Sequence, residues 1–124
     1  MTKFEFTITI GASALNVAAQ AFLGTVGTAY PKGWKNAYGT SFLTSAKLSF
    51  QMAPGSTGEG YVGNASVTNA GANSDYVLAP GSGANPGGYS SVESQTDENI
   101  IDLSQYYVHG SNAGDTVTVS YSQV

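Results

Sequence analysis

The sequence has no cysteine, no arginine and a single histidine among its 124 residues. Because cysteine is missing, the chain has no disulfide, no thiolate ligand for zinc and no cysteine nucleophile. Charged residues make up only 10% of the chain, against about 25% in an average domain, so the polar surface has to consist largely of uncharged side chains. The length suits one unit with its own hydrophobic core, and we expect a single domain over residues 1–124.

Positive charge is scarce and scattered along the chain. The formal net charge is −4, and the cationic side chains are Lys3, Lys32, Lys35 and Lys47. Nucleic-acid binding depends on clustered cations that neutralise phosphates, and attachment to an anionic membrane depends on a polybasic segment. We therefore expect neither nucleic acid nor a membrane as a partner.

The first ten residues, MTKFEFTITI, alternate between polar and apolar side chains. This period of two predicts a strand over residues 3–10 with one buried face, whereas a signal peptide needs an unbroken apolar run. The next apolar stretch, 12–23, is interrupted by Asn16 and Gln20 and is too short and too polar to span a bilayer. Its part 14–23 fits a helix or a strand, and we favour a strand because turn signals flank it.

Short alternating runs separated by turn residues continue to the end of the chain. They predict strands at 42–52, 60–63, 66–68, 75–79, 89–95, 100–103, 105–109 and 116–121, the last two forming a hairpin. No further segment favours a helix. This spacing predicts an all-β fold, either an antiparallel β-sandwich or a jelly-roll-like barrel of roughly eight short strands.

A long loop at about 24–40 interrupts this pattern. It holds four glycines and the aromatic residues Tyr30, Trp34 and Tyr38. Long loops without secondary structure are uncommon and are often functional. The three rings suit a platform for a sugar or a peptide, and they equally suit anchoring of the loop to the core or to a protein interface.

His109 is the one side chain that could act as the base of a Ser-His-Asp arrangement, with Asp102 or Asp115 as the acid. Successive side chains of a strand point to opposite faces, so His109 and Val108 lie on different faces of the predicted strand. A buried Val108 therefore predicts a solvent-facing His109 at the strand end. The sequence has no Gly-x-Ser-x-Gly elbow, and GSGANPGG at 81–88 lacks the third glycine and the strand-to-helix context of a nucleotide loop. We expect no catalytic residue and no enzymatic activity.

Acidic residues gather at Glu93, Asp97, Glu98 and Asp102. Calcium takes six to eight oxygen ligands, but the sequence has no D-x-D-x-D-G loop, and residues 97–99 fit a turn between strands. A glycosidase with paired carboxylates would use the same residues, yet it needs a deep cleft that a chain of this size hardly provides. We expect no metal ion and no other cofactor.

The C-terminal half contains strand and turn motifs in a characteristic order. They read GYVGNASVT at 60–68, YVLAPGSG at 76–83, IIDLSQYYVHG at 100–110 and AGDTVTVSY at 113–121. This order resembles the small capsid decoration (cement) proteins of tailed bacteriophages, in which similar strand and turn motifs follow one another. The first half of the chain, with its aromatic loop, departs from that pattern.

The resemblance implies a non-enzymatic virion structural protein that stabilises the phage head by bridging subunits of the major capsid protein. It also implies a homotrimer on the outer capsid surface, assembled in the host cytoplasm. A carbohydrate- or receptor-binding β-sandwich, in which Trp34 stacks on a sugar, is the alternative. For the capsid contact we expect two regions. One is the stretch 1–6, whose free end is available to add to a capsid strand, and the other is the aromatic loop. The contact residues expected in them are Phe4, Phe6, Tyr30, Trp34 and Tyr38.

Overall fold

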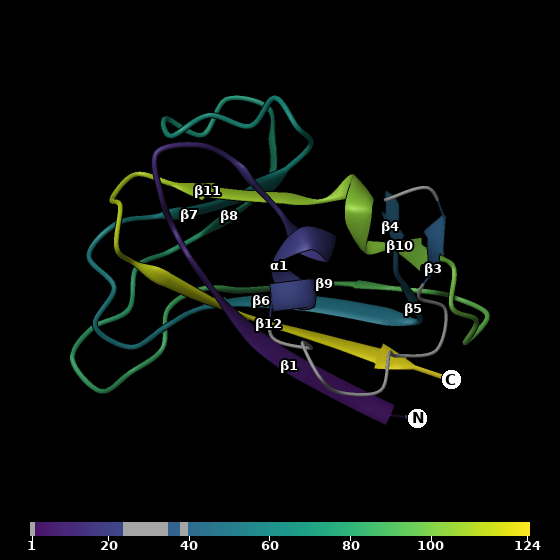
Figure 1. Ribbon diagram of the computed structural model, residues 1–124. Helices are drawn as coiled ribbons and strands as arrows, with labels where there is room; N and C mark the ends of the chain where they lie inside the picture. The colour runs from purple at the N-terminus through teal and green to yellow at the C-terminus, as the bar shows by residue number, and fades with distance from the viewer. Residues whose placement is uncertain (1, 24–34, 38–39) are drawn as a thin grey trace.

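The computed structural model describes residues 2–23, 35–37 and 40–124 (Figure 1). The structure is nearly all-β, with 47% strand and 8% helix. Two four-stranded antiparallel sheets form separate layers, and no closed barrel is present among the described residues. The predicted β-sandwich is therefore confirmed, and the barrel alternative is not found in this part of the chain. The predicted loop aromatics Tyr30, Trp34 and Tyr38 lie outside the described residues.

The first sheet has the order β1-β12-β6-β9, and the second has the order β2-β11-β7-β8. Two short ladders, β5 with β10 and β3 with β4, complete the pairing of the labelled strands. The strands of the first sheet are β1 (Thr2–Thr9), β12 (Thr116–Gln123), β6 (Lys47–Met52) and β9 (Tyr89–Glu93). Those of the second are β2 (Leu15–Asn16), β11 (Tyr107–Gly110), β7 (Gly60–Gly63) and β8 (Ser74–Leu78). The remaining elements are α1 (Val17–Leu23), β3 (Lys35–Ala37), β4 (Thr40–Phe42), β5 (Thr44–Ser45), β10 (Ile101–Asp102) and the 3-10 helix η1 (Leu103–Gln105).

The hydrophobic core lies between the two sheets and also takes in α1 (Figure 1). Large apolar side chains in it lose essentially all contact with water, and each such burial stabilises the fold by about 1.5–3 kcal/mol relative to exposure. The first sheet contributes Ile8, Leu48, Phe50, Met52, Val117, Val119 and Tyr121, the second Val62, Leu78 and Val108, and the helix Val17, Ala18 and Ala21.

The predicted N-terminal strand is confirmed as β1. It pairs with β12 in an unbroken antiparallel register from Thr2↔Gln123 to Thr9↔Thr116, which brings the two ends of the chain side by side (Figure 1). β12 alternates buried and half-buried residues over its whole length. Because both strands follow the period of two, each has one face in the core and one face toward solvent.

The strand predicted over 14–23 is largely wrong, because only Leu15–Asn16 is extended and the helix α1 follows from Val17. Two interactions explain the change. The Asn16 side chain accepts a hydrogen bond from the Ala19 N–H (3.0 Å), as a helix N-cap does, and its amide donates to the Ser104 carbonyl (2.9 Å). Residues Val17, Ala18 and Ala21 then share one buried helical face. No helix in the described ranges is long and apolar enough to cross a membrane.

The predicted hairpin of 105–109 with 116–121 is also wrong, because β11 and β12 belong to different sheets. The turn between them carries the chain from one layer to the other. At its start the Ser111 N–H donates to the Glu59 carbonyl of the second layer (3.0 Å), and at its end the Asp115 carbonyl accepts from Ile10 after β1 (2.8 Å). The turn requires Gly114, whose φ is +95°, a conformation that favours glycine.

Three further strand predictions need correction. The strand predicted over 100–103 is limited to β10 (Ile101–Asp102), because the 3-10 helix η1 begins at Leu103. Residues 66–68 form no strand, since the Val67 N–H closes a turn on the Asn64 carbonyl (3.0 Å). The predicted strand over 42–52 is divided at Leu43 and Ala46 into the end of β4 followed by β5 and β6. Ser45 and Ala46 are both buried, so the alternation between buried and exposed residues breaks at Ala46. The predicted strands at 60–63, 75–79 and 89–95 correspond to β7, β8 and β9.

Tyr121 joins the core to the inner face of β1. Its ring stacks on Phe4 with centroids 5.0 Å apart and meets Phe6 edge-on at 6.1 Å, and only 2% of the residue is exposed. Burial raises the pKa of the Tyr121 phenol to about 12, because desolvation disfavours the phenolate. The pKa of the phenol is therefore about two units higher in the folded chain than in the unfolded chain, where it has the ordinary tyrosine value of about 10.

We predict that part of the stability of the fold depends on this phenol staying neutral. The contribution is fully present below pH 10 and is lost as the pH rises from about 10 to about 12, because the unfolded chain ionises first. Thermal unfolding followed by circular dichroism should show a falling Tm over this range. Tyr121→Phe should flatten that fall while keeping a folded protein at pH 8, and an unchanged slope would contradict the prediction.

Candidate functional site

His109 does not face solvent, so the prediction of an exposed histidine is wrong. It is 6% exposed, its Nδ1 accepts a hydrogen bond from the Gly110 N–H (2.9 Å), and it pairs with Tyr61 in the neighbouring strand. Tyr61 is buried to the same degree, and the loop that follows β7 lies against its ring, since a side chain at Gly71 would touch that ring. The outer face of the second sheet is therefore closed to solvent at this residue pair.

The two candidate acids for His109 have structural partners elsewhere. The Asp102 Oδ1 caps η1 by accepting from the Ser104 N–H (2.9 Å) and hydroxyl (2.7 Å). The Asp115 carboxylate accepts from the backbone N–H groups of Gly58 (2.7 Å) and Thr57 (3.1 Å). Within the described residues neither carboxylate hydrogen-bonds to His109, so the structure does not bring these groups together as a catalytic set.

The acidic residues near β9 and β10 do not converge on one point. In the ranges that the structure describes, no three His, Asp or Glu side chains are placed to hold a metal ion. Glu93 instead pairs with Lys47 (3.1 Å), and Asp97 takes a left-handed conformation with φ +53° in the turn that follows β9. Glu93, Asp97 and Asp102 therefore serve an ion pair, a turn and a helix cap.

Phe4 and Phe6, predicted as contact residues, point toward the core. Both are half-buried and pack on Tyr121. The neighbouring residues Lys3, Glu5 and Thr7 occupy the opposite, solvent-exposed face of β1. Any contact made by β1 in its folded position thus involves its backbone edge and these polar side chains, while the two phenylalanines hold the strand in place.

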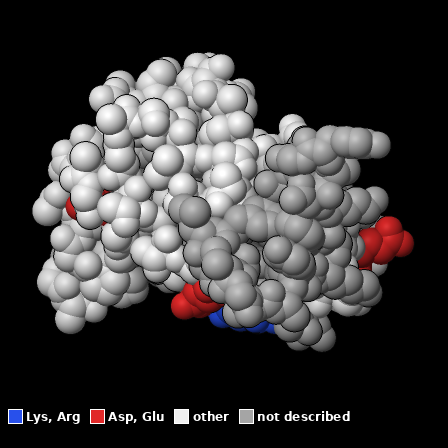
Figure 2. Space-filling view, in the orientation of Figure 1, with Lys and Arg blue, Asp and Glu red and all other residues white. Residues whose placement is uncertain are grey.

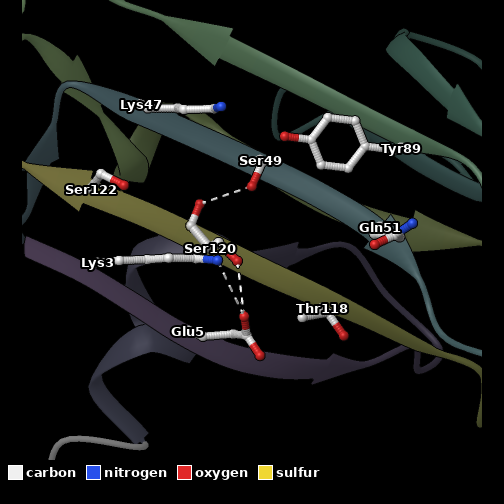
Figure 3. A pocket seen from close by; sticks show the side chains of 9 residues that line it. All are labelled: Lys3, Glu5, Lys47, Ser49, Gln51, Tyr89, Thr118, Ser120 and Ser122. Carbon is white, nitrogen blue, oxygen red and sulfur yellow. Dashed lines mark hydrogen bonds and ion pairs between the residues drawn. The ribbon is translucent and has the colours of Figure 1, made fainter. Parts of the chain in front are cut away.

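A polar hollow of about 270 Å³ lies on the outer face of the first sheet (Figure 3). Its lining residues come from all four strands and are Lys3, Glu5, Lys47, Ser49, Gln51, Tyr89, Thr118, Ser120 and Ser122. The antiparallel registers arrange them in rows across the sheet. One row runs Thr118–Gln51–Tyr89, the next Glu5–Ser120–Ser49, and a third Lys3–Ser122–Lys47.

Tyr89 is the one aromatic side chain in the lining of this hollow. It is 55% exposed, and its ring lies over the sheet with one face turned outward and its hydroxyl toward Lys47 (Figure 3). An exposed ring beside hydroxyl and amide groups combines an apolar surface with hydrogen-bonding groups, as small-molecule sites commonly do.

The charges in the hollow are paired. The Lys47 Nζ lies 3.1 Å from a Glu93 carboxylate oxygen, and the Lys3 Nζ lies 3.8 Å from Glu5. The hydrogen bond to Glu93, followed by the nearby Tyr89 hydroxyl, raises the pKa of Lys47, so this amine stays protonated. Few charged side chains are visible on the face of the molecule in Figure 2, which agrees with the low charge content of the sequence.

Three polar groups in the hollow are free to bind a ligand. Within the described residues the Gln51 amide and the hydroxyl groups of Thr118 and Ser122 make no side-chain hydrogen bond. The Ser49 hydroxyl donates to the Ser120 carbonyl (3.4 Å) and the Ser120 hydroxyl to Glu5 (3.3 Å). Of the free groups, Gln51 and Thr118 lie in the same row as Tyr89. The alternating polar residues of β6 and β12 were visible in the sequence, but their alignment with Tyr89 was not.

A second, wider hollow of about 500 Å³ lies beside β9 and β10. Its apolar lining comes from Ile100, Ile101 and Tyr106, and Ile100 is 63% exposed. The rest of its lining is polar and comes from residues 93–96, Asp102 and Gln105. Through Ile100 this hollow offers an exposed apolar contact surface.

No protein-family model, curated protein or solved structure was found to match the chain. The candidate sites therefore rest on the geometry of the described residues.

We predict that Asp115 is a structural residue. Asp115→Ala should lower the free energy of unfolding by about 1–3 kcal/mol, because the N–H groups of Thr57 and Gly58 would lose a charged acceptor. Denaturation in urea measures the change, with Asp75→Ala on the exposed surface of β8 as the control. A loss no greater than that of the control would contradict this role.

Proposed function

We propose that the chain is a non-enzymatic virion structural protein, a capsid decoration protein that stabilises a phage head by bridging subunits of the major capsid protein. The resemblance of the C-terminal half suggests this class. The structural observation that supports it best is the form of β1, a long strand at the edge of the first sheet.

β1 has the properties of an edge that can accept another strand. Among the described strands it pairs with β12 alone, over eight consecutive residue pairs without a bulge. It contains no proline. A regular edge strand presents unpaired N–H and C=O groups, and such an edge is a template for a strand from another chain.

The hydrogen-bond pattern identifies which groups of β1 are available. The Ile10 N–H donates to the Asp115 carbonyl (2.8 Å), and bonded and non-bonded pairs alternate along an antiparallel ladder. The even-numbered residues of β1 therefore bond to β12. The backbone groups of Lys3, Glu5, Thr7 and Thr9 point to the open side.

Addition of a strand to an exposed sheet edge is a known mode of recognition, in which main-chain hydrogen bonds supply affinity and neighbouring side chains supply specificity, and a capsid strand would bind the β1 edge in this way. The opposite charges of Lys3 and Glu5 would favour one register of the incoming strand. The apolar hollow around Ile100 offers a second contact with the same shell. Many weak contacts repeated over a capsid add up to tight attachment.

We further propose that the protein acts as a homotrimer on the outer capsid surface and that it is assembled into the virion in the host cytoplasm. The low charge content suits subunit contacts, because burial of an unpaired charge is costly. Sedimentation equilibrium tests this assembly, and a monomer at micromolar concentration would count against it.

We predict that Thr7→Pro weakens capsid binding by at least about tenfold, since it removes an outward N–H from the middle of the edge. Proline is tolerated on an edge strand when the missing N–H faces outward, so the variant should remain folded. Co-sedimentation with heads assembled without this protein, taken from the phage that encodes it, measures the binding.

The matched control is Ser91→Pro on β9, the opposite edge of the same sheet. The Met52 N–H donates to the Gly88 carbonyl (3.0 Å), so the same alternation turns the Ser91 N–H outward. This variant should bind like the wild type. Equal binding by all three proteins would exclude β1 addition, and no binding by the wild type, with no gain in the heat resistance of the heads, would exclude the decoration function.

A further inference from the structure

The geometry points to a saccharide-binding site in the polar hollow of the first sheet, with the exposed face of Tyr89 as the stacking platform and the Gln51 amide and Thr118 hydroxyl as hydrogen-bonding groups. The ligand class is an extended, uncharged oligosaccharide. Lys3 and Glu5 of β1 line one side of this hollow, but its stacking and hydrogen-bonding groups lie on β9, β6 and β12, and the proposal does not depend on attachment to a capsid.

The charges of the hollow select an uncharged ligand. Both of its lysines are paired with a carboxylate, Lys47 with Glu93 and Lys3 with Glu5. A phosphate or an acidic polymer would need free cations, and a basic ligand would need free carboxylates. What remains for binding is a set of neutral hydroxyl and amide groups around one ring, which matches the hydroxyl groups and C–H faces of a sugar.

The position of Tyr89 gives the site its apolar part. The ring is 55% exposed, and its open face is turned away from the sheet (Figure 3). Its hydroxyl lies toward Lys47, and the interaction contributes to the raised pKa of that amine. This contact orients the ring before a ligand arrives, so little side-chain freedom has to be lost on binding.

Two of the free polar groups, those of Gln51 and Thr118, extend from the ring in one line. Tyr89 is paired with Gln51, and Gln51 with Thr118, on three neighbouring strands. Adjacent strands lie about 4.8 Å apart, so the row from Tyr89 to Thr118 is about 10 Å long. A ligand that uses both ends has to be longer than one sugar ring, which is why we infer an oligosaccharide that crosses the strands.

A protein partner fits this face less well. The core of a protein interface is rich in apolar and aromatic side chains, whereas the lining here consists of Ser, Thr, Gln and ion pairs with a single ring. The apolar surface suited to a protein lies instead in the hollow around Ile100. The sheet face is thus better matched to a hydroxyl-rich ligand.

The test is a titration of the ¹⁵N-labelled full-length protein with four neutral hexasaccharides, cellohexaose, xylohexaose, mannohexaose and laminarihexaose, followed by heteronuclear NMR. At least one should cause saturable shifts of backbone amides in β9, β6 and β12 at millimolar concentration or below. Tyr89→Ala should weaken that binding at least about tenfold, as loss of a stacking ring typically does. Gln51→Ala should weaken it about two- to tenfold.

Two variants serve as controls. Tyr89→Trp keeps a stacking surface and should retain binding within about threefold. Val77→Ala removes a side chain of similar exposure, 57%, from the second sheet and should leave the titration unchanged. Dispersed spectra without ligand show that each variant is folded.

The proposal is overturned if none of the four sugars shifts these amides, if the shifts lie elsewhere, or if Tyr89→Ala binds like the wild type. Concentration-dependent shifts of the same amides without sugar would also overturn it, because a second copy of the chain would then occupy the face. Its failure is distinct from failure of the decoration function, because sugar binding and capsid binding are measured separately, Thr7 is not a lining residue of the hollow, and Tyr89 is not part of the β1 edge.

Discussion

The alternation along β12 is the constraint on which both faces of the first sheet depend. Val117, Val119 and Tyr121 are buried in the core, and Thr118 and Ser120 between them face outward. Because β12 is paired on one side with β1 and on the other with β6, its parity sets the orientation of both neighbours. A slip by one residue would move the buried side chains to solvent and the hydroxyl groups into the core.

The same constraint determines how the sheet can meet a partner. The edge of β1 offers backbone N–H and C=O groups, whereas the outer face offers side chains with few charges, most of them paired. These are two different kinds of recognition, one by main-chain hydrogen bonds and one by stacking and side-chain hydrogen bonds. A protein that attaches by its edge would keep its sheet face open to solvent, so the two proposed activities are compatible in one molecule.

Several elements were predictable because their signal is local. The N-terminal strand and the strands at 60–63, 75–79 and 89–95 follow from alternation and turn residues that lie within each segment. The helix α1 was not predicted, since its apolar spacing fits either period and the deciding groups are the Asn16 side chain and the distant Ser104 carbonyl. The supposed hairpin was wrong because a turn between two strands does not determine whether they share a sheet.

For the candidate sites, the sequence by itself determined which chemical groups are available, namely few charges and many hydroxyl groups. It also determined that the strands alternate between polar and apolar residues and that the N-terminal strand is regular. Only the tertiary structure decided that His109 is covered, that Phe4 and Phe6 face Tyr121, and that Tyr89 is aligned with Gln51 and Thr118. The physical reason is that the alternation of side chains between the two faces of a strand can be read from residues adjacent in the sequence. The order and register of the strands, in contrast, depend on burial across the whole core. Residues far apart in the chain therefore become neighbours only when the sheets are packed.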